Sequence, residues 1–115
     1  MRRRVHRMNK TIKAIVYERH GNPAEVLQIK TEPWPEPDVD EAIVATRAAP
    51  INPADINAIE GKYPGRREVP AVPGFEGAGV VVEVGANVST IVKGALVILP
   101  HNIGTWREAL AVEAS

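Results

Sequence analysis

The segment Ile51–Tyr63, with the sequence INPADINAIEGKY, combines amide, carboxylate and phenol side chains within a short stretch. The phenol of Tyr63 is neutral at physiological pH because the reference pKa of tyrosine is about 10, so this group can donate a hydrogen bond or a proton. Taken without further context, such a tyrosine more often packs half-buried at the protein surface. Asn52, Asp55 and Asn57 likewise have an ordinary structural role in helix capping and loop hydrogen bonds. A chemical and a structural interpretation therefore both stand for this segment.

The remaining residue types limit metal and redox chemistry. The chain contains no cysteine, which excludes disulfides and thiolate zinc sites. Its histidines, His6, His20 and His101, lie far apart in the sequence and form no H-E-x-x-H spacing, so we interpret them as surface or loop residues. The sequence therefore predicts no metal site.

Three glycines, Gly74, Gly77 and Gly79, lie in and beside the sequence PGFEG and precede a β-rich run. A dinucleotide-binding loop joins a strand to the helix that receives the pyrophosphate, whereas no helix is predicted after these glycines, and their spacing differs from the fingerprint. We therefore interpret them as tight turns beside a strand. Glu76, in the same sequence, is expected to be a buried carboxylate that accepts backbone amides; a polar group lining a cleft is the alternative.

A short helix is predicted inside the first segment, where it would position the side chains described above. Asn52 fits the N-cap, Pro53 fits the first helical position, and Asp55 lies near the positive N-terminus. Gly61 supplies the stop, which leaves a helix of about two turns. The end of this helix would deliver Tyr63 into a loop.

Period-2 alternation and β-branched runs predict several short strands around this helix. Pro33, Pro35 and Pro37 indicate an extended linker that lacks amide donors. The predicted strands cover residues 11–17, 26–30, 41–49, 78–84, 95–99 and 109–112. Many short strands with a single short helix indicate a mainly β fold, a small closed or partly open β-barrel.

Length and composition fit one domain of a globular protein. The chain has 115 residues, of which 44% are apolar and 24% are charged, and its apolar runs are too short to span a bilayer. The formal charge is zero, but Arg2, Arg3 and Arg4 make the N-terminus basic and leave an acidic remainder, which is a poor partner for nucleic acid. We interpret residues 1–10 as a basic extension rather than a mitochondrial presequence. We expect a cytoplasmic protein, with the mitochondrial matrix as the alternative.

Three motifs together resemble a known enzyme superfamily: the segment Ile51–Asn57, the PGFEG sequence of residues 73–77 and the GTWR sequence of residues 104–107. Over nearly all of residues 11–115 the chain is similar to the zinc-free medium-chain dehydrogenase/reductases, in their N-terminal GroES-like catalytic domain. It looks most like the trans-2-enoyl-CoA or acyl-carrier-protein reductases of fatty-acid synthesis, which are quinone oxidoreductase-like. Phe75 stands where zinc-dependent relatives have a histidine ligand. The resemblance thus implies a GroES-like, partly open β-barrel without a metal.

The resemblance also implies roles for individual residues. Tyr63 matches a tyrosine of the active-site cleft, where its phenol would stabilise the enolate that forms on hydride addition or take part in protonating the α-carbon. Asn52 and Asp55 match positions that contact the cofactor, whereas Asn57 and Trp106 match positions on the substrate side.

The implied reaction requires NADPH as cofactor and an enoyl-CoA or enoyl-acyl-carrier-protein as substrate, and full-length relatives would be homodimeric. A chain of 115 residues has room for the catalytic domain, residues 11–115, but not for a Rossmann cofactor domain. We therefore expect the isolated chain neither to bind NADPH tightly nor to catalyse turnover. An NADPH-dependent quinone or activated-alkene reductase domain and a non-catalytic GroES-like module are the alternatives. Neither nucleic acid nor a membrane is expected as a partner.

Overall fold

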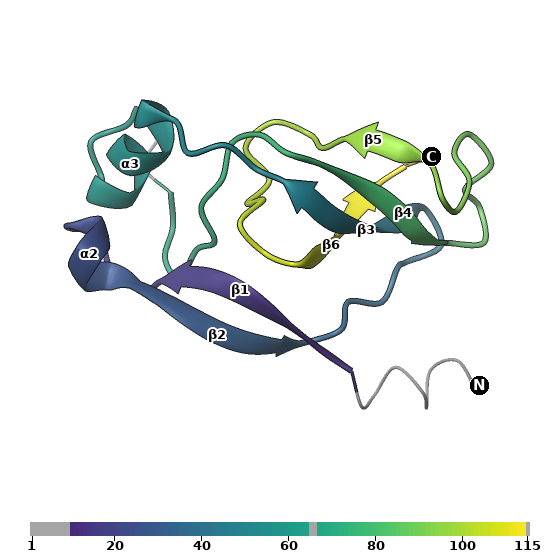
Figure 1. Cartoon of the computed structure of the whole chain (residues 1–115), viewed down its shortest axis with the longest axis horizontal. Helices are drawn as coiled ribbons and strands as arrows, with labels where there is room; N and C mark the ends of the chain where they lie inside the picture. Colours follow the sequence, from purple (N-terminus) through teal and green to yellow (C-terminus); the bar gives the residue numbers. More distant parts are fainter. Residues whose placement is uncertain (1–9, 65–66, 115) are drawn as a thin grey trace.

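Figure 1 shows the fold in the computed structural model, which describes residues 10–64 and 67–114. Its elements in chain order are β1 (Thr11–Tyr17), α2 (Pro23–Val26), β2 (Leu27–Pro33), β3 (Glu41–Ala48), α3 (Pro53–Glu60), β4 (Ala78–Val84), β5 (Leu96–Ile98) and β6 (Ala109–Glu113). The expected basic extension lies outside the described residues apart from Lys10. Within the described residues, neither helix is long and apolar enough to cross a membrane.

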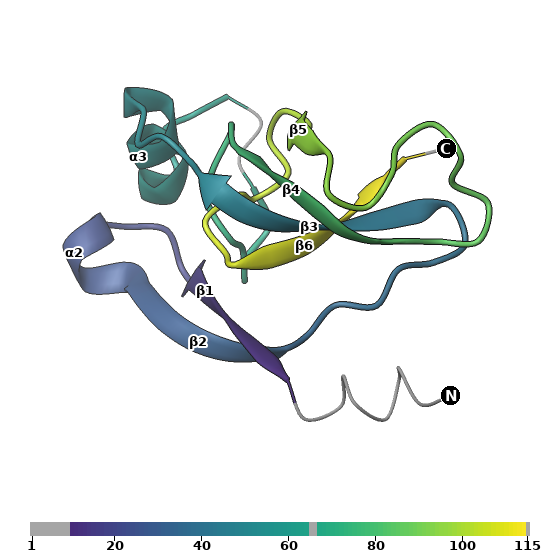
Figure 2. The same ribbon diagram turned by 45° about the vertical axis from the view of Figure 1, so that its right-hand side comes forward.

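The strands form two antiparallel sheets. Strands β5, β4, β3 and β6 are hydrogen-bonded in that order, and β1 pairs with β2 in a separate sheet. In Figures 1 and 2 the smaller sheet lies along one side of the larger one, and both helices gather at one end. Strand β1 is joined to the segment that precedes β6, where the backbone N–H of Ile15 donates to the carbonyl of Trp106 at 2.9 Å. The mainly β, partly open barrel predicted from the sequence is therefore confirmed.

Strand β1 illustrates how alternation predicts this fold. Ile12, Ala14 and Val16 are buried, and the side chains between them point away from the interior. Strand β3 differs, because residues 42–44 are all fully buried. Ala42 and Val44 pack in one apolar cluster and Ile43 packs in another with Ile12 and Ala109, so both faces of β3 are covered.

One predicted strand begins later than expected. The sequence predicts a strand over residues 26–30, whereas Val26 closes the short helix α2 and β2 follows it. The cause is local: Asn22 is the N-cap, its side-chain oxygen accepts the N–H of Ala24 at 3.0 Å, and Pro23 occupies the first turn. The Asn-Pro signal that predicts α3 therefore starts a second helix as well.

Strand β4 approaches β3 closely at one glycine. A Cβ on Gly79 would lie 2.3 Å from the carbonyl oxygen of Ala45, so no side chain fits at this position. Gly79 therefore has a structural role, as predicted, but it lies within β4 and not in a turn beside the strand. The core beside it contains small and branched apolar side chains: Ala42, Val44, Val81, Leu99, Leu110 and Val112.

A separate apolar cluster joins both helices to the smaller sheet. Tyr17 of β1, Val26 of α2 and Ile59 of α3 are buried against one another. Helix α3 lies between the predicted site residues Asn52 and Tyr63. Because Ile59 anchors this helix in the cluster, the cluster fixes the positions of both residues.

The hydroxyl of Tyr17 in this cluster is buried and has no hydrogen-bond partner among the described residues. Burial raises the pKa of Tyr17, and the cation of Arg67 has a smaller opposing influence. Because an unpaired buried hydroxyl costs free energy, we expect Tyr17→Phe to raise the free energy of unfolding at neutral pH by up to about 1 kcal/mol. Urea denaturation would measure this change.

The same variant carries a pH dependence with a defined sign. The pKa of Tyr17 in the folded state lies above the unfolded value of about 10, so the native tyrosine contributes less stability as pH rises through that value. The advantage of Tyr17→Phe over the native protein should therefore grow between neutral pH and about pH 10.5. A variant that is less stable than the native protein at both pH values would contradict this account.

Candidate active site

Helix α3 confirms the capped helix predicted from the sequence. Asn52 is its N-cap in an extended conformation, with φ −95° and ψ 156°, and Pro53 occupies the first turn. Gly61 ends the helix in the left-handed region with φ 79°, where its N–H donates to the carbonyl of Ala58 at 3.1 Å. The chain then turns, and Tyr63 follows.

The carboxylate of Asp55 connects this helix to a distant turn. Asp55 is 1% exposed, and its Oδ2 accepts the backbone N–H of Asn52 at 2.8 Å while its Oδ1 accepts the backbone N–H of Phe75 at 2.9 Å. Both oxygens are therefore used within the protein, where they fasten the start of α3 to the PGFEG turn. The cofactor contact expected of Asp55 stays a prediction, and this geometry favours a positioning role.

Glu76 is exposed, so the prediction of a buried carboxylate that accepts backbone amides is wrong for this residue. Its Oε2 accepts the side-chain Nδ2 of Asn52 at 2.7 Å. The buried role belongs to Asp55 instead. The preceding residue Phe75 turns its ring inward and is 5% exposed, whereas Glu76 is exposed.

Aromatic rings lie in a row beside this pair. Tyr63 packs against Phe75 with ring centroids 5.0 Å apart, and His101 stacks on Phe75 with centroids 5.3 Å apart. Tyr63 nevertheless remains 38% exposed. The ring of Tyr63 thus packs as the structural interpretation expects, while its exposed part is accessible to a ligand as the chemical interpretation requires.

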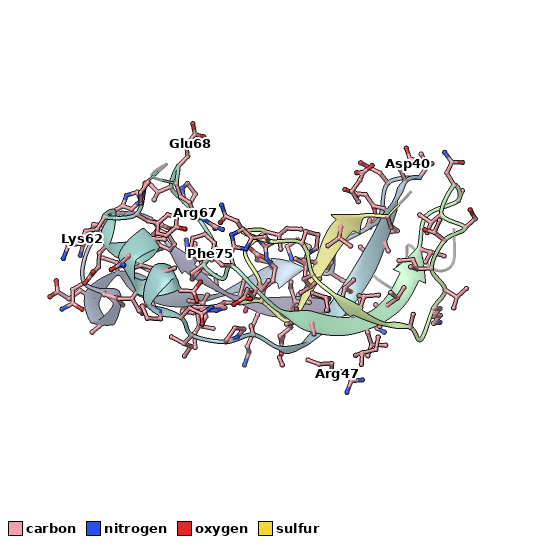
Figure 3. The ribbon with its side chains drawn as sticks, turned by 90° about the horizontal axis from the view of Figure 1, so that it is seen from above. Asp40, Arg47, Lys62, Arg67, Glu68 and Phe75 are labelled. Carbon is pink, nitrogen blue, oxygen red and sulfur yellow. The ribbon has the colours of Figure 1, made fainter. Side chains whose placement is uncertain are left out.

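A guanidinium group lies next to this row. Cζ of Arg67 is 5.7 Å from the ring centroid of Phe75, and Figure 3 shows these two side chains next to each other near α3. Nε of Arg67 donates to Oδ1 of Asn102 at 3.1 Å, and Nη1 donates to the carbonyl of Val72. Arg67 therefore ties the loop before the PGFEG turn to the loop that follows β5.

Gly74 allows the PGFEG and GTWR sequences to meet. It adopts φ 118°, and a Cβ at this position would lie 2.2 Å from Oγ1 of Thr105. The backbone N–H of Trp106 donates to the carbonyl of Pro73 at 3.0 Å, which closes the junction. Only glycine permits both this φ and this approach, so the turn role predicted for Gly74 is confirmed.

Trp106 lies at this junction and faces a groove. Its Nε1 donates to the carbonyl of Pro50 at 3.3 Å, and its ring packs beside the cluster around Tyr17. The groove has a volume of about 610 Å³, and Ile29 and Ile51 are among its apolar lining residues. The substrate-side role of Trp106 stays a prediction.

The structure brings three of the predicted site residues together. Asn52 and Tyr63 are connected through Asp55 and Phe75, since Asp55 bonds to the backbone of both Asn52 and Phe75, and Phe75 supports the ring of Tyr63. Asn57 is exposed on α3. Its expected contact with substrate stays a prediction.

Sequence reasoning missed Phe75, His101 and Arg67 as parts of one site. His101 is exposed in a loop, as the sequence suggests, but its stacking on Phe75 has no local signal. The PGFEG sequence indicates a turn, but it does not indicate which residues Phe75 contacts, because those residues lie far away along the chain. A cavity of about 410 Å³ adjoins the group, and Phe75, Glu76 and His101 are among its lining residues. In residues 10–64 and 67–114, no group of three or more histidine, aspartate and glutamate side chains is placed to hold a metal ion.

The barrel and this polar and aromatic site together define a GroES-like domain. The chain belongs to the alcohol dehydrogenase GroES-like domain family, whose model matches residues 38–113. The match includes β3 to β6, helix α3 and both the PGFEG and GTWR sequences.

Curated relatives are mitochondrial enoyl-[acyl-carrier-protein] reductases. The protein of Arabidopsis thaliana is 47% identical over 109 residues, which cover 94% of this chain and 29% of that protein. The protein of Homo sapiens is 45% identical over 98 residues, which cover 84% of this chain and 26% of that protein. The chain therefore spans less than a third of the length of these relatives.

Solved structures with the same fold include enoyl thioester reductases and quinone reductases. A complex of Etr1p with NADP and crotonyl-CoA superposes with a TM-score of 0.81 at 35% identity, covering 90% of this chain and 32% of that chain. A putative NADPH:quinone reductase from Bacillus thuringiensis gives a TM-score of 0.84 at 36% identity, covering 92% of this chain and 32% of that chain. The Etr1p/Etr2p heterodimer of mitochondrial 2-enoyl thioester reductase from Candida tropicalis gives 0.79 at 36% identity, covering 90% and 32%.

Proposed function

We propose that this chain is the catalytic-domain portion of an NADPH-dependent trans-2-enoyl-thioester reductase. The observation that carries the proposal is Tyr63, whose partly exposed side chain follows the capped helix α3 and rests on the ring of Phe75. Support comes from the 47% identity to a mitochondrial enoyl-[acyl-carrier-protein] reductase and from the likeness to Etr1p, which was solved with NADP and crotonyl-CoA.

The proposed reaction adds a hydride and a proton across the carbon–carbon double bond of an α,β-unsaturated thioester. NADPH, when bound, would supply the hydride to the β-carbon. The electron pair of the carbon–carbon double bond then forms a double bond between the α-carbon and the carbonyl carbon, and the carbonyl π pair moves onto the oxygen to give an enolate. The phenol of Tyr63 either donates a hydrogen bond to that oxygen or takes part in protonating the α-carbon. Phe75 holds the Tyr63 ring in place before substrate binds, so the Tyr63 side chain loses less conformational entropy when the complex forms.

The other site residues divide between cofactor and substrate in this proposal. The half-buried amide of Asn52 contacts the nicotinamide, whose carboxamide group an amide side chain can match in hydrogen bonding. Asp55 positions the site indirectly, because its carboxylate accepts the backbone N–H groups of Asn52 and Phe75. Trp106 and Asn57 shape the substrate side, and Trp106 lines the apolar groove. The rest of NADPH would be held by a separate Rossmann domain of the complete protein, for which the greater length of the relatives leaves room.

The relatives also suggest the setting of this reaction. They are named as mitochondrial reductases of enoyl-acyl-carrier-protein, so we propose the mitochondrial matrix instead of the cytoplasm, and an acyl-carrier-protein or CoA thioester as substrate. The complete protein would form a dimer, as the Etr1p/Etr2p heterodimer does.

A quinone or activated-alkene reductase is the second candidate. It is favoured by the TM-score of 0.84 to a putative NADPH:quinone reductase. The two candidates share the cofactor and differ in the molecule that accepts the hydride.

A substrate panel distinguishes the two candidates. We would replace the matching segment of the Arabidopsis relative by this chain and assay the chimera with NADPH against crotonyl-CoA, crotonyl-acyl-carrier-protein and a quinone. If Tyr63 stabilises the enolate as proposed, thioester reduction is expected within about tenfold of the unaltered relative, which serves as the control. Strong quinone turnover without thioester reduction would favour the second candidate, and turnover of neither would contradict both.

A further inference from the structure

The guanidinium of Arg67 connects two loops beside the ring of Phe75. Its Nε donates to Oδ1 of Asn102 at 3.1 Å, and its Nη2 donates to Oδ1 and to the backbone carbonyl of the same residue. Its Nη1 donates to the carbonyl of Val72, and its Cζ lies 5.7 Å from the ring centroid of Phe75. The planar fork of a guanidinium is rigid, so it fixes the groups that it contacts relative to one another. Arg67 therefore fixes the loop after β5 relative to the residues that precede the PGFEG turn.

Asn102 contacts both Arg67 and the PGFEG turn. It has a positive φ of 61°, a conformation that asparagine adopts more readily than most residues. Its backbone N–H donates to the carbonyl of Phe75 at 2.8 Å. His101, the residue before it, stacks on the Phe75 ring with centroids 5.3 Å apart. The loop that Arg67 holds is thus the loop that supports Phe75.

The loop that carries Tyr63 has few backbone hydrogen bonds. Within its described residues, 62–64 and 67–71, backbone–backbone hydrogen bonds occur only at the two ends, at Lys62 and at Ala71. A segment without such bonds depends on its side chains to stay in place. Arg67 lies between the two ends, and the side-chain hydrogen bonds of these described residues are those of its guanidinium. Arg67 is therefore the anchor of this loop.

We propose that Arg67 is a positioning residue for the reduction and that, together with Asn102, it holds the Tyr63 phenol where it acts on the substrate. Tyr63 lies four residues before Arg67 in the chain, and its ring packs on Phe75 with centroids 5.0 Å apart. This inference rests on the proposed function, in which the phenol acts on the enolate. It adds which residues keep the phenol in place. A misplacement of about 1 Å in a reacting group can cost about 10²-fold in rate, so such an anchor matters for catalysis.

The test is a double-mutant cycle of Arg67→Ala and Tyr63→Phe in the chimera described above. Arg67→Ala should lower kcat for crotonyl-CoA about tenfold, whereas the dissociation constant for NADPH, measured by fluorescence titration, should change by less than about twofold. In the Tyr63→Phe background the same substitution should lower kcat by less than about twofold, because no phenol is left to position. A purely structural role of Arg67, or a direct contact with substrate, would instead lower kcat by the same factor in both backgrounds.

Two milder variants and a control accompany the cycle. Asn102→Gly removes Oδ1 but permits the same positive φ, and it keeps the N–H that donates to Phe75. Its kcat should fall about threefold to fivefold, with the same dependence on Tyr63. Arg67→Lys should lie between the native protein and Arg67→Ala, because an ammonium group lacks the planar fork. Arg19 is exposed, and Arg19→Ala should leave kcat unchanged.

Cleavage after Glu68 by a glutamate-specific protease measures the holding of the loop without turnover. Glu68 is exposed beside Arg67, and Figure 3 shows it pointing away from the fold. Asn102→Gly leaves the sequence of the loop unchanged, so the protease meets the same residues in both proteins. If the contact between Asn102 and Arg67 holds the loop, this substitution should raise the cleavage rate about fivefold. Thermal melting of each variant would show that the fold is retained.

The outcomes distinguish this inference from the proposed function. Equal losses of kcat in both Tyr63 backgrounds, no loss in Arg67→Ala, or an unchanged cleavage rate in Asn102→Gly would each overturn the inference. A chimera in which Asn102→Gly raises the cleavage rate but which reduces no crotonyl thioester would contradict the proposed function, and the holding of the Tyr63 loop by Arg67 would stand.

Discussion

Replacing Tyr63 by phenylalanine is expected to lower kcat for crotonyl-CoA reduction by the chimera about 10²- to 10³-fold, the usual effect of losing one proton or hydrogen-bond donor to a developing oxyanion. The substitution keeps the ring that packs on Phe75 and removes only the phenol oxygen. The contact assigned to Asn52 is untouched, so the dissociation constant for NADPH should change by less than about threefold. Steady-state oxidation of NADPH and fluorescence titration measure the two effects.

The second tyrosine provides a matched control. Tyr17→Phe removes the same atom from a ring that is fully buried in the cluster with Val26 and Ile59. Its kcat should therefore stay within about twofold of the native value. If Tyr63→Phe also stays in that range, Tyr63 is a packing residue and the catalytic role proposed for it is wrong.

Replacing Asp55 by alanine is expected to lower the free energy of unfolding by about 3–5 kcal/mol. The substitution leaves the backbone N–H groups of Asn52 and Phe75 without their acceptor, and each unpaired buried donor costs about 1–3 kcal/mol. Asp55→Asn should lose less, because its amide oxygen can still accept one of the two N–H groups. Urea denaturation of the complete chimera measures these changes.

Asp38 offers the comparison for this prediction. It is exposed, so Asp38→Ala should change the free energy of unfolding by no more than about 0.5 kcal/mol. A loss of less than about 1 kcal/mol in Asp55→Ala would mean that the two N–H groups find other acceptors, and Asp55 would not then be the connection between α3 and the PGFEG turn.

The elements that sequence reasoning predicted well are those with local causes. The alternation of Ile12, Ala14 and Val16 predicts β1 because one side of a strand must be buried. The Asn-Pro start and the glycine stop predict α3 because capping depends on neighbours within one turn. Helix α2 was missed although the same signal precedes it, because a four-residue helix has too little apolar pattern to be recognised.

The assignment of the buried carboxylate could not be made from local patterns. The sequence predicts Asp55 near the start of a helix and Glu76 as the buried carboxylate that accepts backbone amides. Burial was decided by which side of α3 and of the PGFEG turn faces the core, and the acceptor role went to Asp55 through a bond to Phe75. Such a choice depends on the packing of segments that are distant in the sequence.

The sequence by itself determined the barrel class, helix α3 and the presence of Tyr63 at its end, because strand alternation and helix caps involve residues close along the chain. Only the tertiary structure decided that Phe75 supports Tyr63 and that Glu76 faces the Asn52 amide. These contacts join α3 to the PGFEG turn across the fold. No local spacing encodes them, since the distance between such residues is set by how the sheets and α3 pack together.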